Sequence, residues 1–275
     1  MELINVLGGS GFVGGRFCEL TPNTLVNERH DYHVKSNNIL YFISTVDNYN
    51  VYTDPFIDIE TNLTTLIKTL ETIGNRQVGN VTFNFISSWF VYGNVPLPAK
   101  ETATCDPKGF YSITKRAAEQ LLISYCETFG LNYRILRLSN ILGPQDKKVS
   151  KKKNALQYMI NQLKNNEDIS LYDGGNTYRD YLYVDDCVDA INLILEKGDL
   201  NTIYNVGSGY PTYIGKVIEY AKEQLNSTSN IGNIPPAEFH NIVQTKNMVL
   251  DTTKLQLLGF KPKYSSYDIV NTLIK

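Results

Sequence analysis

An apolar run followed at once by evenly spaced glycines constrains the fold of this chain more than any other feature. Residues 3–7 read Leu-Ile-Asn-Val-Leu, which predicts a buried strand, and Gly8 comes directly after them. Glycine lets the chain turn sharply and lets backbone N–H groups approach a pyrophosphate, while the helix that follows adds its positive end. We therefore predict a dinucleotide-binding turn. The residues expected against the dinucleotide here are Gly8, Gly11, Phe12, Val13 and Gly14.

Further apolar runs alternate with segments of helical periodicity. The runs show little polar alternation, as expected of strands covered on both faces. Strands are expected at residues 24–26, 39–43, 81–86, 133–138 and 181–184, and helices at 59–73, 112–129, 155–163 and 188–195. This alternation predicts an α/β chain with a Rossmann-type doubly wound parallel sheet.

Composition excludes several classes of protein. A net charge of −2 over 275 residues argues against a general nucleic-acid binder, because such binding neutralises phosphates with many cations. No apolar run approaches the roughly 18 residues of a membrane span, and the first residues show no signal peptide. The four cysteines form no CxxC pair and there are only three histidines, so neither a disulfide framework nor a metal site is expected. A cytoplasmic protein is the expectation.

The end of the second expected strand bears on the choice of cofactor. Dinucleotide sites usually carry an acidic residue roughly 20 positions after the first glycine, where it holds the ribose hydroxyls. Glu28 at that place would favour NAD. Alternatively, Asn27 ends the strand and Arg29 faces a 2′-phosphate, which would favour NADP. The sequence leaves NAD and NADP both open.

A tyrosine and a lysine four residues apart, Tyr111 and Lys115, stand at the start of an expected helix. Residues at i and i+4 share one helix face, and a nearby ammonium favours phenolate over phenol. Tyr111 is therefore expected to act as a general acid or base near neutral pH. Ser88 follows a buried strand, and in open α/β sheets ligands bind at the carboxyl ends of the strands. These three residues are the predicted catalytic set.

Together these features resemble the extended short-chain dehydrogenase/reductase family, in its nucleotide-sugar epimerase, dehydratase and reductase branch. The resemblance runs along almost the whole chain. Its blocks are the glycine turn, Asp54-Pro55 with Asn62, Ser88 before Val91-Tyr92-Gly93, Tyr111-x-x-x-Lys115, Arg137 to Pro144, Tyr178 to Asp186, Tyr204 to Gly209, and Leu258 to Pro262.

The resemblance implies roles for further residues. It implies a nicotinamide cofactor that exchanges a hydride with a sugar carbon, usually C4, of a nucleotide-linked hexose. Tyr111, Lys115, Ser44 and Leu138 would also contact the cofactor, with Ser139 near the nicotinamide. Asn62, Ser88, Asn140 and Arg179 would contact or support the substrate, with Asn140 and Arg179 at its diphosphate. A homodimer formed by the helices at 63–73 and 112–129 is implied as well.

Departures from the family pattern narrow the expected reaction. The dehydratases carry an Asp-Glu pair directly after the residue that matches Ser88, and here Trp89 and Phe90 stand there. Neither side chain carries a proton, which argues against 4,6-dehydration. The expected function is therefore 4-epimerisation, with an NAD(P)H-dependent 4-keto-sugar reductase as the alternative. A non-catalytic dinucleotide sensor is a more remote alternative, because such proteins commonly lose the Tyr–Lys pair.

The spacing between the second and third apolar runs is too short for the family's usual helix and third strand. We therefore predict that the third strand is missing or vestigial. Residues 1–145 and about 179–215 are expected to form the cofactor domain. Residues 146–178 and 216–275 are expected to form a smaller, mixed α/β substrate lobe that is loop-rich from Gly207 to Pro236.

A cluster of lysines from Lys147 to Lys153 allows two interpretations. It forms either a solvated surface loop or a basic rim that attracts an anionic substrate. The family often has an arginine about ten positions before the residue matching Asp251, and here Phe239-His240-Asn241 occupies that region. Lys246 or the lysine cluster would then take the place of that arginine.

Overall fold

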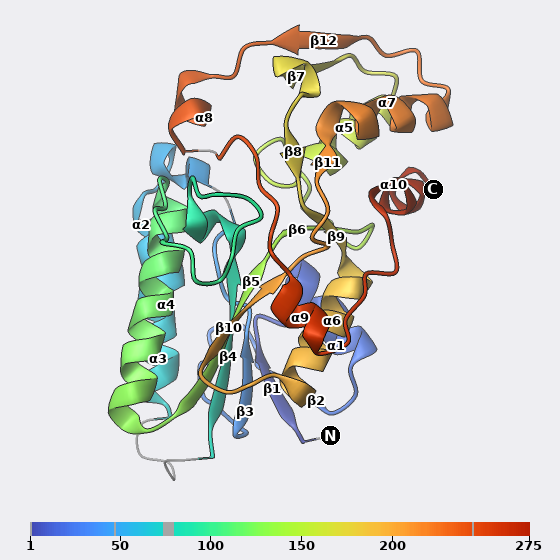
Figure 1. Ribbon diagram of the computed structural model, residues 1–275. Coiled ribbons are helices and arrows are strands. Elements are labelled where there is room, and N and C mark those ends of the chain that lie inside the picture. The colour runs from blue at the N-terminus through green and yellow to red at the C-terminus, as the bar shows by residue number, and fades with distance from the viewer. Residues whose placement is uncertain (1, 47, 74–79, 244) are drawn as a thin grey trace.

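The computed structural model of this protein describes residues 2–46, 48–73, 80–243 and 245–275. Within these residues, a parallel sheet of six strands forms the centre, in the order β10-β5-β4-β3-β1-β2 (Figure 1). The strands are β1 (Ile4–Leu7), β2 (Thr24–Val26), β3 (Asn38–Tyr41), β4 (Thr82–Ser88), β5 (Asn132–Leu138) and β10 (Thr202–Val206). The predicted fold class is confirmed.

The order of strands reverses at β1. The chain pairs β2 with one edge of β1 and then returns to pair β3 with the other edge. At such a reversal the loops leave β1 and β3 in opposite directions, which opens a crevice at the carboxyl ends of the strands. Phe42 N–H donates to the carbonyl of Leu7 at 2.8 Å, so the chain after β3 runs beside the end of β1.

Helices cover both faces of the sheet (Figure 1). On one face α1 (Phe12–Leu20) packs against α6 (Val184–Lys197), and on the other lie α3 (Thr65–Glu71) and α4 (Phe110–Phe129). Adjacent residues Ile39 and Leu40 of β3 enter different apolar cores, as the alternation of side chains along a strand requires. The absence of polar alternation in the sequence thus follows from this double coverage.

The expected helix at 59–73 differs in detail. It begins earlier, as α2 (Phe56–Ile59), passes through a π-helical turn η2 (Glu60–Thr64), and continues as α3. Two 3₁₀ turns flank the crevice, η1 (Asn48–Tyr52) and η3 (Trp89–Tyr92). The π turn carries Asn62, whose hydrogen bonds are described with the candidate active site.

The predicted loss of the third strand agrees with the structure. Residues 27–37, all of them described, form no strand or helix, and β2 pairs with β1 alone. Asn27 holds this loop together, since its Nδ2 donates to the carbonyls of Asp31 and His33, each at 2.8 Å. Asn5 donates to the side-chain oxygen of Asn27 at 2.6 Å. Asn5 Oδ1 also accepts from the N–H of Lys35 at 2.7 Å, and Thr72 Oγ1 donates to the carbonyl of Tyr32 at 3.1 Å. A short loop held by side chains from outside and within it therefore replaces a strand and its crossover.

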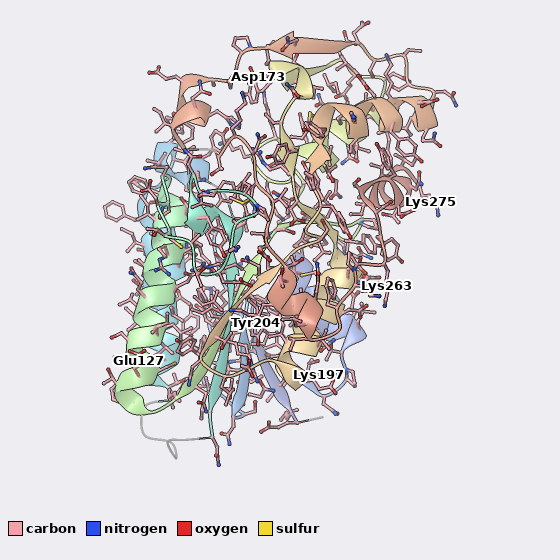
Figure 2. The ribbon with its side chains drawn as sticks, in the orientation of Figure 1. Glu127, Asp173, Lys197, Tyr204, Lys263 and Lys275 are labelled. Atoms are coloured by element: carbon pink, nitrogen blue, oxygen red, sulfur yellow. The ribbon has the colours of Figure 1, made fainter. Side chains whose placement is uncertain are left out.

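A second lobe lies beyond the carboxyl ends of the strands, in the upper part of Figures 1 and 2, where Asp173 is labelled. Its small sheets pair segments that are far apart in sequence, β12 with β7 and β11 with β8. Its elements are α5 (Ala155–Lys164), β7 (Ile169–Tyr172), η4 (Asp173–Gly175), β8 (Tyr178–Arg179), β11 (Thr212–Tyr213), α7 (Ile214–Leu225), β12 (Ile231–Ile234), α8 (Glu238–Val243) and α10 (Ser266–Ile274).

The stretch from Gly207 to Pro236 is more regular than expected. It contains α7 and β12, so the prediction of a loop-rich segment is wrong there. Its apolar side chains pack into the core that also holds α6. Between sheet and lobe run β6 (Asn140–Leu142), β9 (Tyr181–Tyr183) and α9 (Thr253–Leu257). The domain boundaries given above stay a prediction.

Among the described residues, the helices all fall short of the length and apolar character that a membrane-crossing helix requires.

Candidate active site

The glycine turn after β1 is built for close backbone approach. Gly8 has φ +85°, which disfavours any residue with a Cβ. A Cβ on Gly14 would lie 2.5 Å from the carbonyl oxygen of Gly8, so α1 packs tightly against the turn. Gly11 caps α1 without a side-chain hydrogen bond. The helix therefore presents bare N–H groups, which suit a phosphate.

A single large cleft joins this turn to the second lobe. Its volume is about 1570 Å³, well above the roughly 300–1,000 Å³ of a pocket for one small ligand. The predicted site residues that line it are Gly8, Gly11, Phe12, Val13, Gly14, Ser44, Ser88, Tyr111, Lys115, Leu138, Asn140 and Arg179. The structure thus gathers most of the predicted set at one place, with room for two ligands.

Lys115 lies on the first turns of α4 and is almost completely buried. Its Nζ donates to the carbonyl of Ile86 at 2.7 Å and stands 4.0 Å from the ring centre of Phe85. Burial lowers the pKa of Lys115 to about 7, and the charge of Glu119 opposes that shift. Tyr111, one turn earlier, lines the same cleft. The lysine is therefore fixed to the end of β4, next to the tyrosine.

Consecutive serines at the end of β4 both contribute to the cleft lining, but their side chains have different partners. Ser88 lines the cleft, and its Oγ accepts from the N–H of Phe90 at 3.3 Å. Ser87 instead donates to the carboxylate of Glu119 at 2.6 Å. The alternation of a strand thus gives one serine to the site and the other to its support.

The two aromatic residues after Ser88 form a wall of the cleft. The rings of Trp89 and Phe90 stack with centres 3.9 Å apart, and Phe90 meets Tyr111 edge-on at 6.0 Å. Trp89 also packs in an apolar cluster with Met248 and Leu250. The pair therefore both fills a core and lines the cleft with apolar surface.

Asn62 lies behind the cleft wall and forms hydrogen bonds with residues of two neighbouring segments. Its Oδ1 accepts from Ser44 Oγ and from the N–H of Thr45, each at 3.0 Å. Its Nδ2 donates to Thr45 Oγ1 at 2.8 Å and to Thr114 Oγ1 at 2.9 Å. The side chain is buried and is absent from the cleft wall, which favours a supporting role for Asn62; its contact with the substrate stays a prediction.

Arg179 and Asn140 stand at the second-lobe side of the cleft. Arg179 donates to the backbone carbonyls of Thr245 and Lys246, and its guanidinium lies 5.6 Å from the ring centre of Trp89. Burial lowers the pKa of Arg179 from its usual value. Asn140 Nδ2 donates to the carbonyl of Asp180 at 3.1 Å. Both side chains are thus oriented by backbone groups at the cleft wall.

The residues proposed to choose between NAD and NADP lie elsewhere. Asn27 is buried, with its side chain committed to the loop described above. Glu28 and Arg29 are exposed and do not line the cleft. Their role in cofactor binding stays a prediction.

The lysine cluster lines the same cleft as the glycine turn. Lys147, Lys148 and Lys151 to Lys153 all contribute to its wall. Lys153 Nζ pairs with Asp146 at 2.8 Å and lies 5.9 Å from the ring centre of Phe12, which starts α1. This position favours the basic-rim interpretation over a loop that only faces solvent.

Sequence reasoning missed an aromatic contact that bridges the cleft. The ring of Phe239 on α8 meets Tyr49 at 5.2 Å and Tyr52 at 4.7 Å, both from η1. His240 packs on Tyr172 with ring centres 4.8 Å apart, and burial lowers the pKa of that histidine. No local pattern marks these residues, because the contact joins segments nearly 190 positions apart in sequence.

The chain matches known proteins along most of its length. A model described as the "NAD dependent epimerase/dehydratase family" matches residues 33–207. The dTDP-D-glucose 4,6-dehydratase of Dictyostelium discoideum is 32% identical over 51% of this chain and 34% of its own length. The putative UDP-glucose 4-epimerase of Methanocaldococcus jannaschii is 26% identical over 82% of this chain and 72% of its own length.

Solved structures share the whole fold. The UDP-glucose 4-epimerase of Thermotoga maritima, solved with UDP-glucose, superposes with a TM-score of 0.85 at 25% identity. That match covers 98% of this chain and 97% of the other. The curated dehydratase, in contrast, is matched over only about a third of its length.

Proposed function

Because this chain belongs to the NAD-dependent epimerase/dehydratase family, we propose that it epimerises a nucleotide-linked hexose at C4, with NAD or NADP as cofactor. One observation carries the proposal: Ser88, Tyr111 and Lys115 line the same cleft as the glycine turn. That cleft has room for a dinucleotide and a nucleotide-sugar together.

The residues around the glycine turn fit a dinucleotide. The space that a Cβ on Gly14 would fill is needed for helix packing, and the uncapped end of α1 faces the cleft. The buried Oγ of Ser139 has no hydrogen-bond partner among the described residues and lies on the cleft wall beside Leu138. The nicotinamide of a bound cofactor would accept and return a hydride at the sugar carbon.

Tyr111 moves the proton that accompanies this exchange. Its phenolate oxygen takes the proton of the sugar hydroxyl and later gives it back to the keto oxygen. The ammonium of Lys115 favours the phenolate. Ser88 donates a hydrogen bond to the same sugar oxygen and holds it in place.

The walls of the cleft support epimerisation rather than dehydration. Removing water from a sugar requires a proton donor and a proton acceptor, and Trp89 and Phe90 provide neither at the positions where dehydratases carry them. To invert C4, the keto-sugar must present its other face before the hydride returns. The flat apolar wall formed by Trp89 and Phe90 makes few polar contacts with the keto-sugar, so it does not hinder this rotation of the sugar.

The second lobe supplies groups for the diphosphate. Arg179 offers a half-buried guanidinium, whose fork suits phosphate oxygens, and Asn140 offers an amide. The lysine cluster and Lys246 also line the cleft and raise its positive potential. An anionic nucleotide-sugar fits this wall.

The test uses the purified protein with UDP-, dTDP-, CDP- and GDP-hexoses. We expect one sugar to give its C4 epimer by NMR, with no net change in cofactor oxidation. Steady consumption of NADPH with a 4-keto-sugar would identify the alternative, a reductase. Bound cofactor that no sugar reduces would leave the non-catalytic sensor.

We also propose a homodimer in a reducing, cytoplasmic setting. Ile67 on α3 and Ile113 and Leu121 on α4 are exposed apolar residues on the outer side of these helices. All four cysteines are free. Sedimentation as a monomer at micromolar concentration would contradict the dimer.

A further inference from the structure

A buried cluster of charges lies directly behind Lys115. Glu119, one helical turn further along α4, has no exposed surface. Its carboxylate accepts from Arg137 Nε and Nη2 at 3.0 and 2.8 Å, from Arg116 Nη1 at 2.8 Å, and from Ser87 Oγ at 2.6 Å. Burial raises the pKa of Glu119, but the hydrogen bonds and charge of Arg137 outweigh burial and hold that pKa below its usual value. The carboxylate is therefore ionised.

The charge balance of this cluster depends on Glu119. Arg116 and Arg137 bring two positive charges to one carboxylate, and Lys115 adds a third at i−4 on the same helix face. Without Glu119, the ammonium of Lys115 would share a low-dielectric region with a buried guanidinium and no anion to balance it.

Other titratable groups around Lys115 do not provide this balance. Tyr111 and Arg116 lie on α4 itself, and the groups that interact with Arg137 are Tyr92 on η3 and Cys105 between η3 and α4, with Glu101 close to Tyr92 and Arg137. Burial raises the pKa of Tyr92 to about 12 and also raises the pKa of the Cys105 thiol, so both are neutral near pH 7. Glu101 Oε1 accepts from the backbone N–H of Asn205.

The same cluster also holds the end of β4. Lys115 donates to the carbonyl of Ile86, and Glu119 accepts from the next residue, Ser87. Ser88, which faces the cleft, follows immediately. Glu119 thus affects two members of the predicted catalytic set. It acts on Lys115 through its charge, and on Ser88 by holding the preceding residue of β4.

We propose that Glu119 is a positioning residue that keeps Lys115 protonated, so that Lys115 in turn stabilises the phenolate of Tyr111. The inference rests on the proposed function, because it assigns Tyr111 and Lys115 the roles given there. Glu119 itself is buried and does not line the cleft.

The test replaces Glu119 with Gln, which keeps the size of the side chain and one acceptor oxygen, removes the charge, and loses the acceptor for two of the four hydrogen bonds. The charge of Glu119 raises the pKa of Lys115, and one pKa unit corresponds to a factor of ten, so without that charge we expect kcat near pH 7 to fall about tenfold. The KM for the nucleotide-sugar should stay unchanged. Glu127→Gln is the matched control, since Glu127 is exposed at the far end of the same helix (Figure 2).

A spectroscopic readout separates this inference from the proposed function. The protein has 19 tyrosines, so the tyrosinate signal of Tyr111 is obtained as the difference from a Tyr111→Phe variant. In Glu119→Gln this titration should move to higher pH, because Lys115 loses its proton first and no longer favours the phenolate. The measurement needs no turnover, so it remains valid if the wild type acts on none of the sugars.

A double variant guards against failure of Glu119→Gln to fold. Glu119→Gln with Arg137→Gln removes one charge of each sign, and the tyrosinate titration should return toward its wild-type position. An unshifted titration in folded Glu119→Gln, or a double variant in which the titration stays shifted, would overturn the proposal.

Discussion

Two regions of the cleft are built in opposite ways. At the β4–α4 end, formed by residues 82–92 and 110–119, side chains are buried and hydrogen-bonded, as Lys115 and Glu119 illustrate. Asn62 donates to Thr114 of this end from the π turn. At the β2 end, formed by residues 24–37, a three-residue strand leads into a loop in which Glu28 and Arg29 are exposed. The side chains of Asn5, Asn27 and Thr72 hold that loop through its backbone.

The two ends therefore differ in how rigidly their side chains are held. A group that transfers a proton needs a fixed position and a controlled charge, which only a buried network supplies. A region that holds a ligand by backbone N–H groups and general shape needs much less. We therefore expect substitutions at the β4–α4 end to change chemistry, and those at the β2 end to change affinity modestly.

The largest effect is expected from Tyr111→Phe, which removes only the hydroxyl that moves the proton. General acid–base catalysis contributes about 10²–10⁴-fold, so kcat should fall by that factor while the cofactor still binds. Steady-state kinetics with the identified sugar measures the loss. Tyr125→Phe on the same helix is the control, because its hydroxyl donates to the carbonyl of Leu70, away from the cleft. Normal turnover by Tyr111→Phe would show that Tyr111 does not transfer the proton and would contradict a catalytic role for the β4–α4 end.

Gly14→Ala tests the glycine turn that both ends share. The new Cβ would lie 2.5 Å from a backbone oxygen that has no freedom to move, so we expect about 1–3 kcal/mol of lost stability and weaker cofactor binding. Denaturant unfolding and calorimetric titration with NAD and NADP measure both. In Gly15→Ala the nearest atom is 3.4 Å away, and alanine favours the helix by up to about 1 kcal/mol. Equal behaviour of the two variants would contradict this packing.

Lys115→Met should stabilise the protein while abolishing activity. The folded pKa of about 7 lies below the usual value near 10.4, so the unfolded state binds more protons between these pH values and wild-type stability rises with pH there. Below that window the buried charge destabilises the fold fully. We expect the variant to be more stable by about 1 kcal/mol at pH 6, since the lost hydrogen bond to Ile86 offsets part of the gain. Above about pH 10 the lysine is neutral in both states, so the gain should disappear and the lost hydrogen bond should leave the variant slightly less stable than wild type. A stability difference that does not change with pH would contradict this prediction.

The smallest effects are expected at the β2 end. Glu28→Ala and Arg29→Ala remove exposed side chains outside the cleft, so each should change NAD or NADP affinity less than about tenfold. Stability should stay within about 0.5 kcal/mol. A larger, selective loss of NAD affinity in Glu28→Ala, or of NADP affinity in Arg29→Ala, would contradict this prediction. It would show that the β2 end selects the cofactor through these side chains.

The sequence predicted the β1 turn, the parallel sheet and the Tyr111–Lys115 pair because each depends on local spacing. A buried strand reads as an apolar run, and an i, i+4 pair needs only a helix. The missing third strand was predictable for the same reason, since a short connection has no room for it.

Other features depend on distant segments meeting. The pairing of β12 with β7 joins residues about sixty positions apart, and the contact of Phe239 with Tyr49 joins the two lobes. The role expected of Asn62 stays a prediction, and its hydrogen bonds to Thr45 and Thr114 come from the π turn, which no sequence pattern revealed. Burial of a charged pair such as Glu119 and Arg137 is likewise a property of the assembled core.

The shortened β2 region also affects how the folded chain behaves toward its own copies. Loss of the third strand turns β2 into an edge strand, and an open edge invites pairing with another chain and hence aggregation. Here the edge is only three residues long, and the charged residues Glu28, Arg29, Asp31 and Lys35 follow it. A short edge strand next to charged residues is a poor template for pairing with another chain. The protein therefore lacks the third strand without exposing an edge that promotes aggregation.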